Sequence, residues 1–169
     1  FVYTSPALME GLTGVVSYQP QGANSESATG YGVNYSGVEG LTLNWATTEI
    51  DGTSATTRGD NSAMKVAYAY GPVTVAYSDY EYDAQTDSAD DEMTSYKLSY
   101  TISDELSVSY GQEEITTNSL TAEYEMVSAS YTAGGMTITA SMSDATDRDG
   151  TTTATMDNER WALGASFAF

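Results

Sequence analysis

The stretch MKVAYAYGPVTVAY, residues 64–77, contains two runs of alternating residues joined by a Gly-Pro pair. In each run one parity is apolar or aromatic, and the other holds small or polar residues. Alternation with a period of two is typical of a β-strand that has two different faces. The stretch therefore predicts a hairpin. The apolar parity of its first strand comprises Met64, Val66, Tyr68 and Tyr70.

The same pattern recurs along the 169 residues, for example in YKLSYTI (96–102) and MTITASM (136–142). Tyr, Thr and Ser are abundant and no apolar stripe with a 3.6-residue period persists, so the expected fold is all-β. The pattern predicts about eleven strands, near residues 1–5, 11–19, 28–36, 40–50, 61–70, 72–83, 92–102, 105–115, 120–133, 135–146 and 158–169.

The links between these segments alternate in length. The tight ones are residues 36–40, 71–72, 103–105 and 134–135, with 5–11 slightly longer, and the loose polar ones are 20–28, 51–61, 83–92, 116–120 and 147–158. Short turns at one end and longer loops at the other predict an antiparallel up-and-down sheet.

Composition excludes several classes of function. Lys plus Arg is 5 and Asp plus Glu is 24, for a net charge of −19, so a nucleic-acid partner is not expected. The absence of Cys and His removes disulfides, thiolate zinc sites and Cys–His or Ser–His catalysis. Paired carboxylates such as Glu113–Glu114 have no partner nucleophile or metal-ligand set. No enzyme activity and no cofactor are predicted.

A lipid bilayer explains the pattern best. Strands of about 9–11 tilted residues cross the hydrocarbon region, and their sheet must close into a barrel with aromatic girdles at both interfaces. The alternative is a soluble β-sandwich with a Tyr-rich core. Two aromatic bands result from one assignment of faces: Tyr3, Tyr35, Tyr70, Tyr100, Tyr131 and Phe169 near the short turns, and Tyr18, Tyr31, Trp45, Tyr77, Tyr96, Tyr110 and Trp161 toward the long loops.

The chain's last residues, NERWALGASFAF (158–169), place Trp161 on the same parity as two terminal rings, which are expected to face lipid. GASFAF, with Gly164, Phe167 and Phe169, resembles the C-terminal β-signal of bacterial outer-membrane proteins. That resemblance implies recognition by the barrel assembly machinery.

FVYTSPALMEGLTGVVSYQP (1–20) resembles a segment in the middle of general diffusion porins, notably those of alphaproteobacteria. The resemblance implies a sixteen-stranded homotrimeric barrel in the outer membrane, in contact with lipid and lipopolysaccharide. Eleven antiparallel strands leave two edges that run the same way, whereas bacterial barrels have even strand numbers. Residues 1–169 are thus expected to form one barrel domain truncated on its N-terminal side, as strands six to sixteen, with the constriction loop upstream of Phe1. A complete ten- or twelve-stranded barrel is the alternative.

The parity opposite the apolar rows predicts the pore lining. Its basic members are either a strip opposite acidic groups that orients polar solutes, or solvated residues paired with nearby carboxylates. The small hydroxyls on this parity suit a water-filled channel. The predicted lining residues are Lys65, Lys97, Arg160, Asn44, Ser99, Ser109 and Thr139.

Carboxylates on the outward parity, beyond the outer aromatic band, form either a solvated rim or sites for Ca²⁺ or Mg²⁺ against lipopolysaccharide phosphates. Glu123 and Glu125 share parity with lipid-facing Val127, which a bulge near Tyr124, a subunit contact or a lower membrane boundary would explain. The outward set is Glu49, Asp79, Glu81, Glu114, Asp144 and Glu159.

The loop DATDRDG (144–150) offers Asp144, Asp147 and Asp149 as weak candidates for binding Ca²⁺ or Mg²⁺. An EF-hand loop is not matched, because position twelve is Asn158. Only weak divalent-cation binding is expected here.

The predicted function is passive diffusion of small hydrophilic solutes and ions through a water-filled outer-membrane channel. Carboxylates that crowd the external mouth predict a preference for cations. The alternative is a non-conducting barrel that acts as an adhesin or structural anchor, with acidic external loops that bind divalent cations.

Overall fold

The computed structural model describes residues 1–21, 26–55, 58–86, 89–148 and 157–167. The elements that can be named in these residues are all β-strands, with single 3₁₀ residues at Ala89 and Arg148, and none of the described residues belongs to a helix long and apolar enough to cross a membrane. The strands are β1 (Val2–Thr4), β2 (Leu12–Gln19), β3 (Ser27–Tyr35), β4 (Leu41–Asp51), β5 (Gly59–Tyr70), β6 (Val73–Ala84), β7 (Asp91–Thr101), β8 (Leu106–Thr117), β9 (Leu120–Ala133), β10 (Met136–Thr146) and β11 (Asn158–Phe167).

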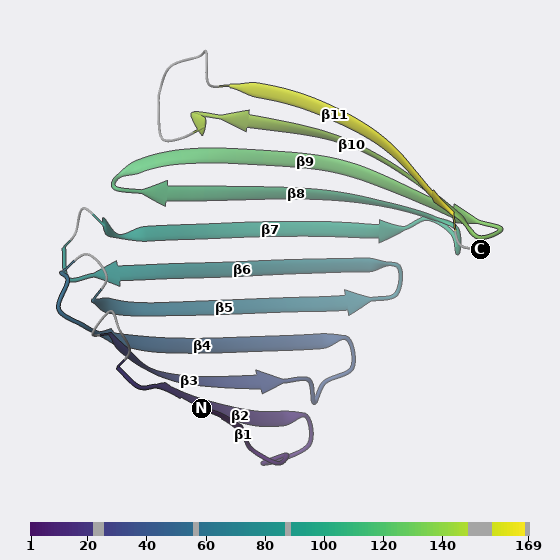
Figure 1. The fold of residues 1–169 in the computed structure, drawn as a ribbon. Helices are drawn as coiled ribbons and strands as arrows, with labels where there is room; N and C mark the ends of the chain where they lie inside the picture. The colour runs from purple at the N-terminus through teal and green to yellow at the C-terminus, as the bar shows by residue number, and fades with distance from the viewer. Residues whose placement is uncertain (22–25, 56–57, 87–88, 149–156, 168–169) are drawn as a thin grey trace.

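The strands form one sheet in sequence order, and every neighbouring pair is antiparallel. The β1–β2, β3–β4, β5–β6, β7–β8 and β9–β10 connections lie at one end of the sheet and the others at the opposite end (Figure 1). The predicted loose link at residues 116–120 is wrong, because β8 and β9 are joined by Asn118 and Ser119 alone. Gly40 in the β3–β4 turn has φ +77°, and a side chain there would strike the Ala69 carbonyl oxygen, so this turn requires glycine. The predicted all-β, antiparallel up-and-down fold is confirmed.

The predicted strands agree closely with the observed ones. The segment 120–133 has the same limits as β9, and 135–146 differs from β10 by one residue. The segment 61–70 begins two residues later than β5. Strand positions therefore follow directly from the period-two pattern.

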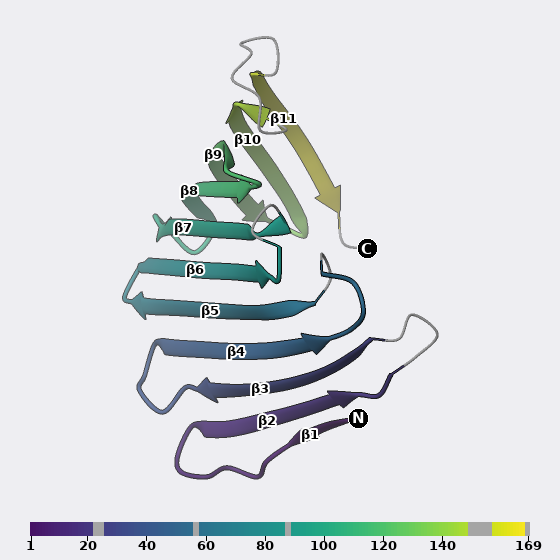
Figure 2. The ribbon, with the colours of Figure 1, turned by 90° about the vertical axis from the view of Figure 1, so that its left-hand side faces the viewer.

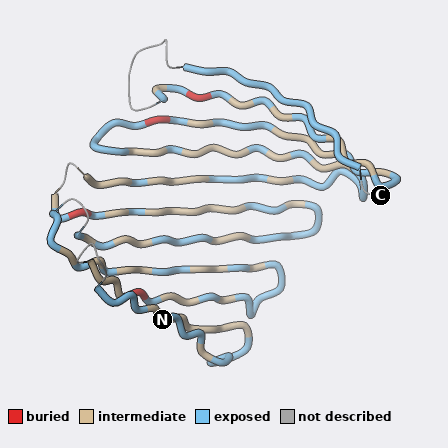
Figure 3. Tube along the Cα trace, in the orientation of Figure 1, coloured by how far each residue is buried: buried red, intermediate tan, exposed pale blue. Residues whose placement is uncertain are grey.

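The sheet is a single layer with almost no interior (Figure 3). Among the described residues the only buried apolar side chains are alanines, Ala84, Ala122 and Ala145. Large apolar side chains are exposed instead, with Trp161 at 76% and Leu163 at 71%. A soluble sandwich would bury its apolar rows between two sheets. The sandwich alternative is therefore wrong, and this apolar surface matches one that contacts lipid.

The sheet curves strongly, but its two edge strands do not meet (Figure 2). Because β1 and β11 are separated by ten antiparallel pairings, they run in the same direction. The free edges of these two strands cannot pair with one another in antiparallel fashion. The described strands therefore form an open part of a barrel-like wall.

Candidate functional site: the inner face of the sheet

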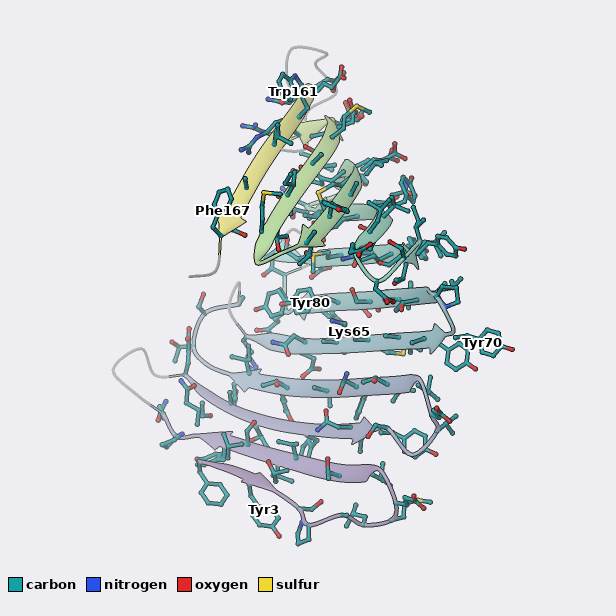
Figure 4. All side chains as sticks on the ribbon, turned by 90° about the vertical axis from the view of Figure 1, so that its right-hand side faces the viewer. Tyr3, Lys65, Tyr70, Tyr80, Trp161 and Phe167 are labelled. Carbon is teal, nitrogen blue, oxygen red and sulfur yellow. The ribbon has the colours of Figure 1, made fainter. Side chains whose placement is uncertain are left out.

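The register places all seven predicted lining residues on the same face. Lys65 is opposite Asn44 on β4 and Ser78 on β6. Further along the sheet, Ser99 is opposite Ser109. We call the face that carries Lys65, Lys97 and Arg160 the inner face, and the face that carries Tyr68, Leu98 and Trp161 the outer face. Side chains project from both faces of the single layer (Figure 4).

Hydroxyl groups line the inner face in rows that cross the strands. Ser109 and Ser128 are joined by a hydrogen bond of 2.7 Å, and Ser78 and Ser95 by one of 2.6 Å. Paired hydroxyls retain capacity to hydrogen-bond water without adding bulk or charge. One continuous row runs from β6 to β10 and consists of Thr74, Ser99, Ser109, Ser128 and Ser141.

The three basic residues within the strands all project from the inner face. Lys97 and Arg160 lie in one cross-strand row, separated by Gly111, Met126 and Ser143 on the strands between them. No described carboxylate lies within ion-pair distance of Lys65, Lys97 or Arg160. The interpretation that these cations pair with neighbouring carboxylates therefore has no support among the described residues.

Two hollows of more than 400 Å³ border the inner face. The first, of about 450 Å³, extends from β2 to β7 and is bordered by Asn34, Asn44 and Lys65. The second, of about 560 Å³, extends from β7 to β11 and contains Lys97 and Arg160. In each hollow, most of the lining residues project from the inner face. The inner face is therefore the concave side of the curved sheet.

Aromatic and thioether side chains on the inner face were missing from the predicted lining. Tyr80 and Met93 border the first hollow, and Tyr124 and Met126 border the second. Their parity could have identified them, because Tyr80 shares parity with Ser78, and Tyr124 shares parity with Ser128. The inner wall thus combines hydroxyls and cations with apolar patches nearer the long loops.

Carboxylates within the strands show the opposite preference to the cations. Only Asp91 and Glu113 project from the inner face. The others project from the outer face and include all six carboxylates of the predicted outward set: Glu49, Asp51, Asp60, Asp79, Glu81, Asp83, Glu92, Glu114, Glu123, Glu125, Asp144 and Glu159.

The position of Glu125 follows from its partners. Glu125 is opposite Asp144, which in turn is opposite Glu159, so all three lie in one row of the outer face. Tyr110 donates a hydrogen bond of 2.8 Å to Glu125. The pairing of β9 is unbroken through Tyr124, so there is no bulge at that point. Glu125 therefore belongs to the outer-face carboxylates listed above, which we call the carboxylate rim. On β9–β11 this rim reaches one row further from the long connections than it does on β6–β8.

A family model described as Gram-negative porin matches residues 1–124, which is most of the chain. The chain belongs to the Gram-negative porin family. This membership confirms the predicted resemblance to porins.

The porin fold also recurs in a solved structure. A mutant of the Rhodobacter blastica porin superposes with a TM-score of 0.68 at 14% sequence identity, over 94% of this chain and 64% of that one. The present chain thus spans less than two thirds of that porin's length. No curated protein matches the sequence.

Family membership places this porin in the bacterial outer membrane, as predicted. Porins are channels rather than enzymes, which agrees with the prediction of no catalysis.

The C-terminal strand of the porin places the residues of the predicted assembly signal on different faces. Gly164 is on the inner face opposite Thr139, and a β-carbon there would lie 3.0 Å from the Thr139 hydroxyl oxygen. Phe167 is on the outer face and 60% exposed. Phe169 lies outside the described residues.

The candidate metal ligands do not converge in the part of the chain that the structure describes. No group of three or more acidic side chains there is placed to hold one metal ion. Asp144 accepts a hydrogen bond from Thr146, and Asp147 has a positive φ of 51° just after β10. Asp149 lies outside the described residues. Weak binding of Ca²⁺ or Mg²⁺ at these loops stays a prediction.

Proposed function

We propose that this porin chain forms the wall of a water-filled outer-membrane channel for passive diffusion of small hydrophilic solutes and ions. The observation that carries the proposal is the contrast between the faces. The concave inner face holds hydrogen-bonded serines and cations without a described carboxylate partner, while the outer face exposes the large apolar side chains. Interior charge shapes the field that a passing solute experiences.

A closed channel requires strands in addition to those described. Because β1 and β11 run in the same direction, closure with antiparallel pairing needs an odd number of further strands. We propose that residues 1–169 form one portion of a larger barrel domain. The test is the intact mass of the native polypeptide, which should be well above 18.0 kDa. A native polypeptide of that mass with a closed barrel would contradict this proposal.

The proposed channel prefers cations. The chain carries 24 acidic and five basic residues, and many of the acids lie in or next to the longer connections at one end of the sheet. Carboxylates around a pore mouth raise the local concentration of cations there. The inner wall carries the opposite sign, so the mouth and the wall act on ions in opposite directions.

The native protein in a planar lipid bilayer tests both proposals. Stable ohmic conductance steps are expected, and a KCl gradient should give a reversal potential on the cation side. A reversal potential on the anion side contradicts the cation preference. A barrel without conductance steps supports the adhesin or structural-anchor alternative instead.

We also propose that Gly164, Phe167 and Phe169 form the segment bound by the barrel assembly machinery, and that the mature porin is a homotrimer. Both proposals rest on the resemblance to outer-membrane proteins and general diffusion porins. Phe167→Ala should reduce the amount of folded protein in the outer membrane, while Leu163→Ala, on the same outer face, should not. Cross-linking in native membranes should give a trimer.

A further inference from the structure

A smaller hollow on the inner face lies between the two strand lysines. Its volume is about 150 Å³, and it extends from β5 to β7. Lys65 on β5 and Lys97 on β7 border it, and the intervening strand contributes the short side chains of Ala76 and Ser78. The space above β6 is therefore accessible to both ammonium groups.

Short side chains of the inner face form the floor of this hollow. Ser95, opposite Ser78, completes the lining. Tyr77 and Tyr96 also border the hollow, but their rings lie on the outer face, with centroids 5.2 Å apart. These two residues can therefore contribute only their main chain. Every side chain that faces the hollow thus belongs to an alanine, a serine or a lysine.

No carboxylate borders this hollow among the described residues. The second hollow differs, because Glu113, Glu125 and Asp144 all belong to its lining. The first hollow differs as well, because Lys65 borders it together with Asp79. The 150 Å³ hollow, unlike either larger one, is therefore lined by positive side chains without acidic ones.

The register places two carboxylates beside the lining. Glu113 is opposite Ser95 on the inner face, and Asp79 lies on the outer face, where it accepts a hydrogen bond from Tyr77. No described carboxylate is within ion-pair distance of either lysine. With Glu113 counted, two lysines and one carboxylate on the inner face leave a net positive charge at neutral pH. The inner face around the hollow therefore favours an anion over a cation.

The lining offers hydrogen-bond donors from three directions. The hydroxyl oxygens of Ser78 and Ser95 are 2.6 Å apart, so one hydroxyl hydrogen joins them and the other can donate to a ligand. Lys65 and Lys97 are two strand spacings and two residues apart, which is about 12 Å between their backbones. Because a lysine has a flexible four-carbon stem and only donor hydrogens, both ammonium groups can approach one acceptor between them.

The size of the hollow limits the ligand to a small ion. Its volume is below the range of about 300–1,000 Å³ that is usual for larger ligands. A tetrahedral oxyanion such as phosphate or sulfate carries four oxygen atoms that point in different directions. It can therefore accept hydrogen bonds from both ammonium groups and from the serine pair at once, and lysine is a common binder of phosphate.

We propose that Lys65, Lys97 and the Ser78–Ser95 hydroxyl pair form a binding site for a small tetrahedral oxyanion, phosphate or sulfate, on the channel wall. The site deepens the proposed function, on which it rests: a channel whose mouth favours cations holds an oxyanion at this point of its wall.

Calorimetry on the full native protein in detergent, with inorganic phosphate as the probe at constant ionic strength, tests the site directly. Saturable binding of one phosphate per chain is expected, and sulfate should compete with it better than chloride does. Lys65→Gln and Lys97→Gln should each weaken phosphate binding by about tenfold, the loss of one charge-assisted hydrogen bond. Arg160→Gln removes the third inner-face cation of the strands and is the matched control, with unchanged affinity. Equal loss in all three variants, or equal competition by chloride, would overturn the inference.

The serine pair provides a second matched comparison. Ser109 and Ser128 are hydrogen-bonded in the same way, at 2.7 Å, but no lysine lies opposite them or two residues along either strand. Ser78→Ala combined with Ser95→Ala should weaken phosphate binding by about tenfold, because a donor to a charged acceptor is lost. Ser109→Ala combined with Ser128→Ala should leave it unchanged. Equal affinities of the two double variants would contradict the role of the Ser78–Ser95 pair.

A bilayer measurement separates this inference from the proposed function. Phosphate added to the conducting porin at constant ionic strength should lower the single-channel current, and the reduction should be smaller in Lys65→Gln. Conductance without phosphate binding overturns the site and leaves the channel intact. Phosphate binding without ohmic steps overturns the channel and leaves the site intact. Heat-modifiable mobility on gels verifies that each variant is folded.

Discussion

The inner and outer faces of the same eleven strands carry opposite charge. The three basic residues of the strands all project inward, while all the strand carboxylates except Asp91 and Glu113 project outward. Neighbouring residues such as Lys97 and Leu98 therefore have different surroundings, although they are adjacent in sequence. The comparison shows that one sheet can present a cationic wall on one side and an apolar, acid-rimmed surface on the other, because alternate residues point in opposite directions.

The largest expected effect on stability is the difference between a charge added on the outer face and one added at the next residue, on the inner face. Leu98→Arg puts a cation on the outer face and should destabilise the barrel by about 2–4 kcal/mol, as Arg does at the bilayer midplane. Ser99→Arg, the next residue and on the inner face, should cost far less because its charge stays in water. Urea unfolding in lipid vesicles measures both, and equal losses would contradict the assignment of faces.

A smaller effect is expected at the outer rim, where Asp144 lies between Glu125 and Glu159. Like charges directly opposite each other on a sheet are destabilising. Asp144→Asn should therefore stabilise the fold by about 0.5 kcal/mol at low salt, a gain of the size usual for cross-strand pairs. High ionic strength should diminish the gain by screening.

The same unfolding measurement provides the control for the rim. Asp104 lies in the short β7–β8 turn, outside this row of carboxylates. Asp104→Asn should therefore leave the free energy of unfolding nearly unchanged. A rim variant that is less stable than the native protein would indicate that the three carboxylates bind a cation or a partner rather than repel one another.

The smallest effect concerns ion selectivity. Removing the charge of Lys65 takes away a repulsion for a cation and an equal attraction for an anion, each about 0.5 kcal/mol at roughly 8 Å in water before screening. Because roughly 8 Å is one Debye length at physiological salt, screening lowers each to about 0.2 kcal/mol, so Lys65→Met should raise the preference for K⁺ over Cl⁻ about twofold. Glu49→Gln, on the outer face, should leave the preference nearly unchanged. Reversal potentials in a KCl gradient compare the two variants, and a larger shift in the Glu49 variant would contradict the wall assignment.

Strand positions and faces were predictable because both depend on local periodicity. The predicted segment 120–133 coincides with β9, and the outward parity of Glu49 and Asp79 agrees with the register. Local periodicity is not sufficient near Tyr124, where it left a bulge as one explanation and the structure has none. Parity placed Glu125 among lipid-facing residues, and only its pairing with Asp144 showed that it lies at the height of the rim.

The sequence by itself determined the number of strands and the face on which each side chain lies. These properties depend on neighbours within a few residues, where the period of two is directly visible. The tertiary structure alone decided which residues share a row. Lys97 and Arg160 are 63 positions apart in sequence, yet the register of β7 to β11 aligns them at one hollow, which Arg148 also borders. Short turns fix the register of a hairpin, but the long connection between β10 and β11, residues 147–157, does not, so only the pairing of these two strands aligns Arg160 with Lys97.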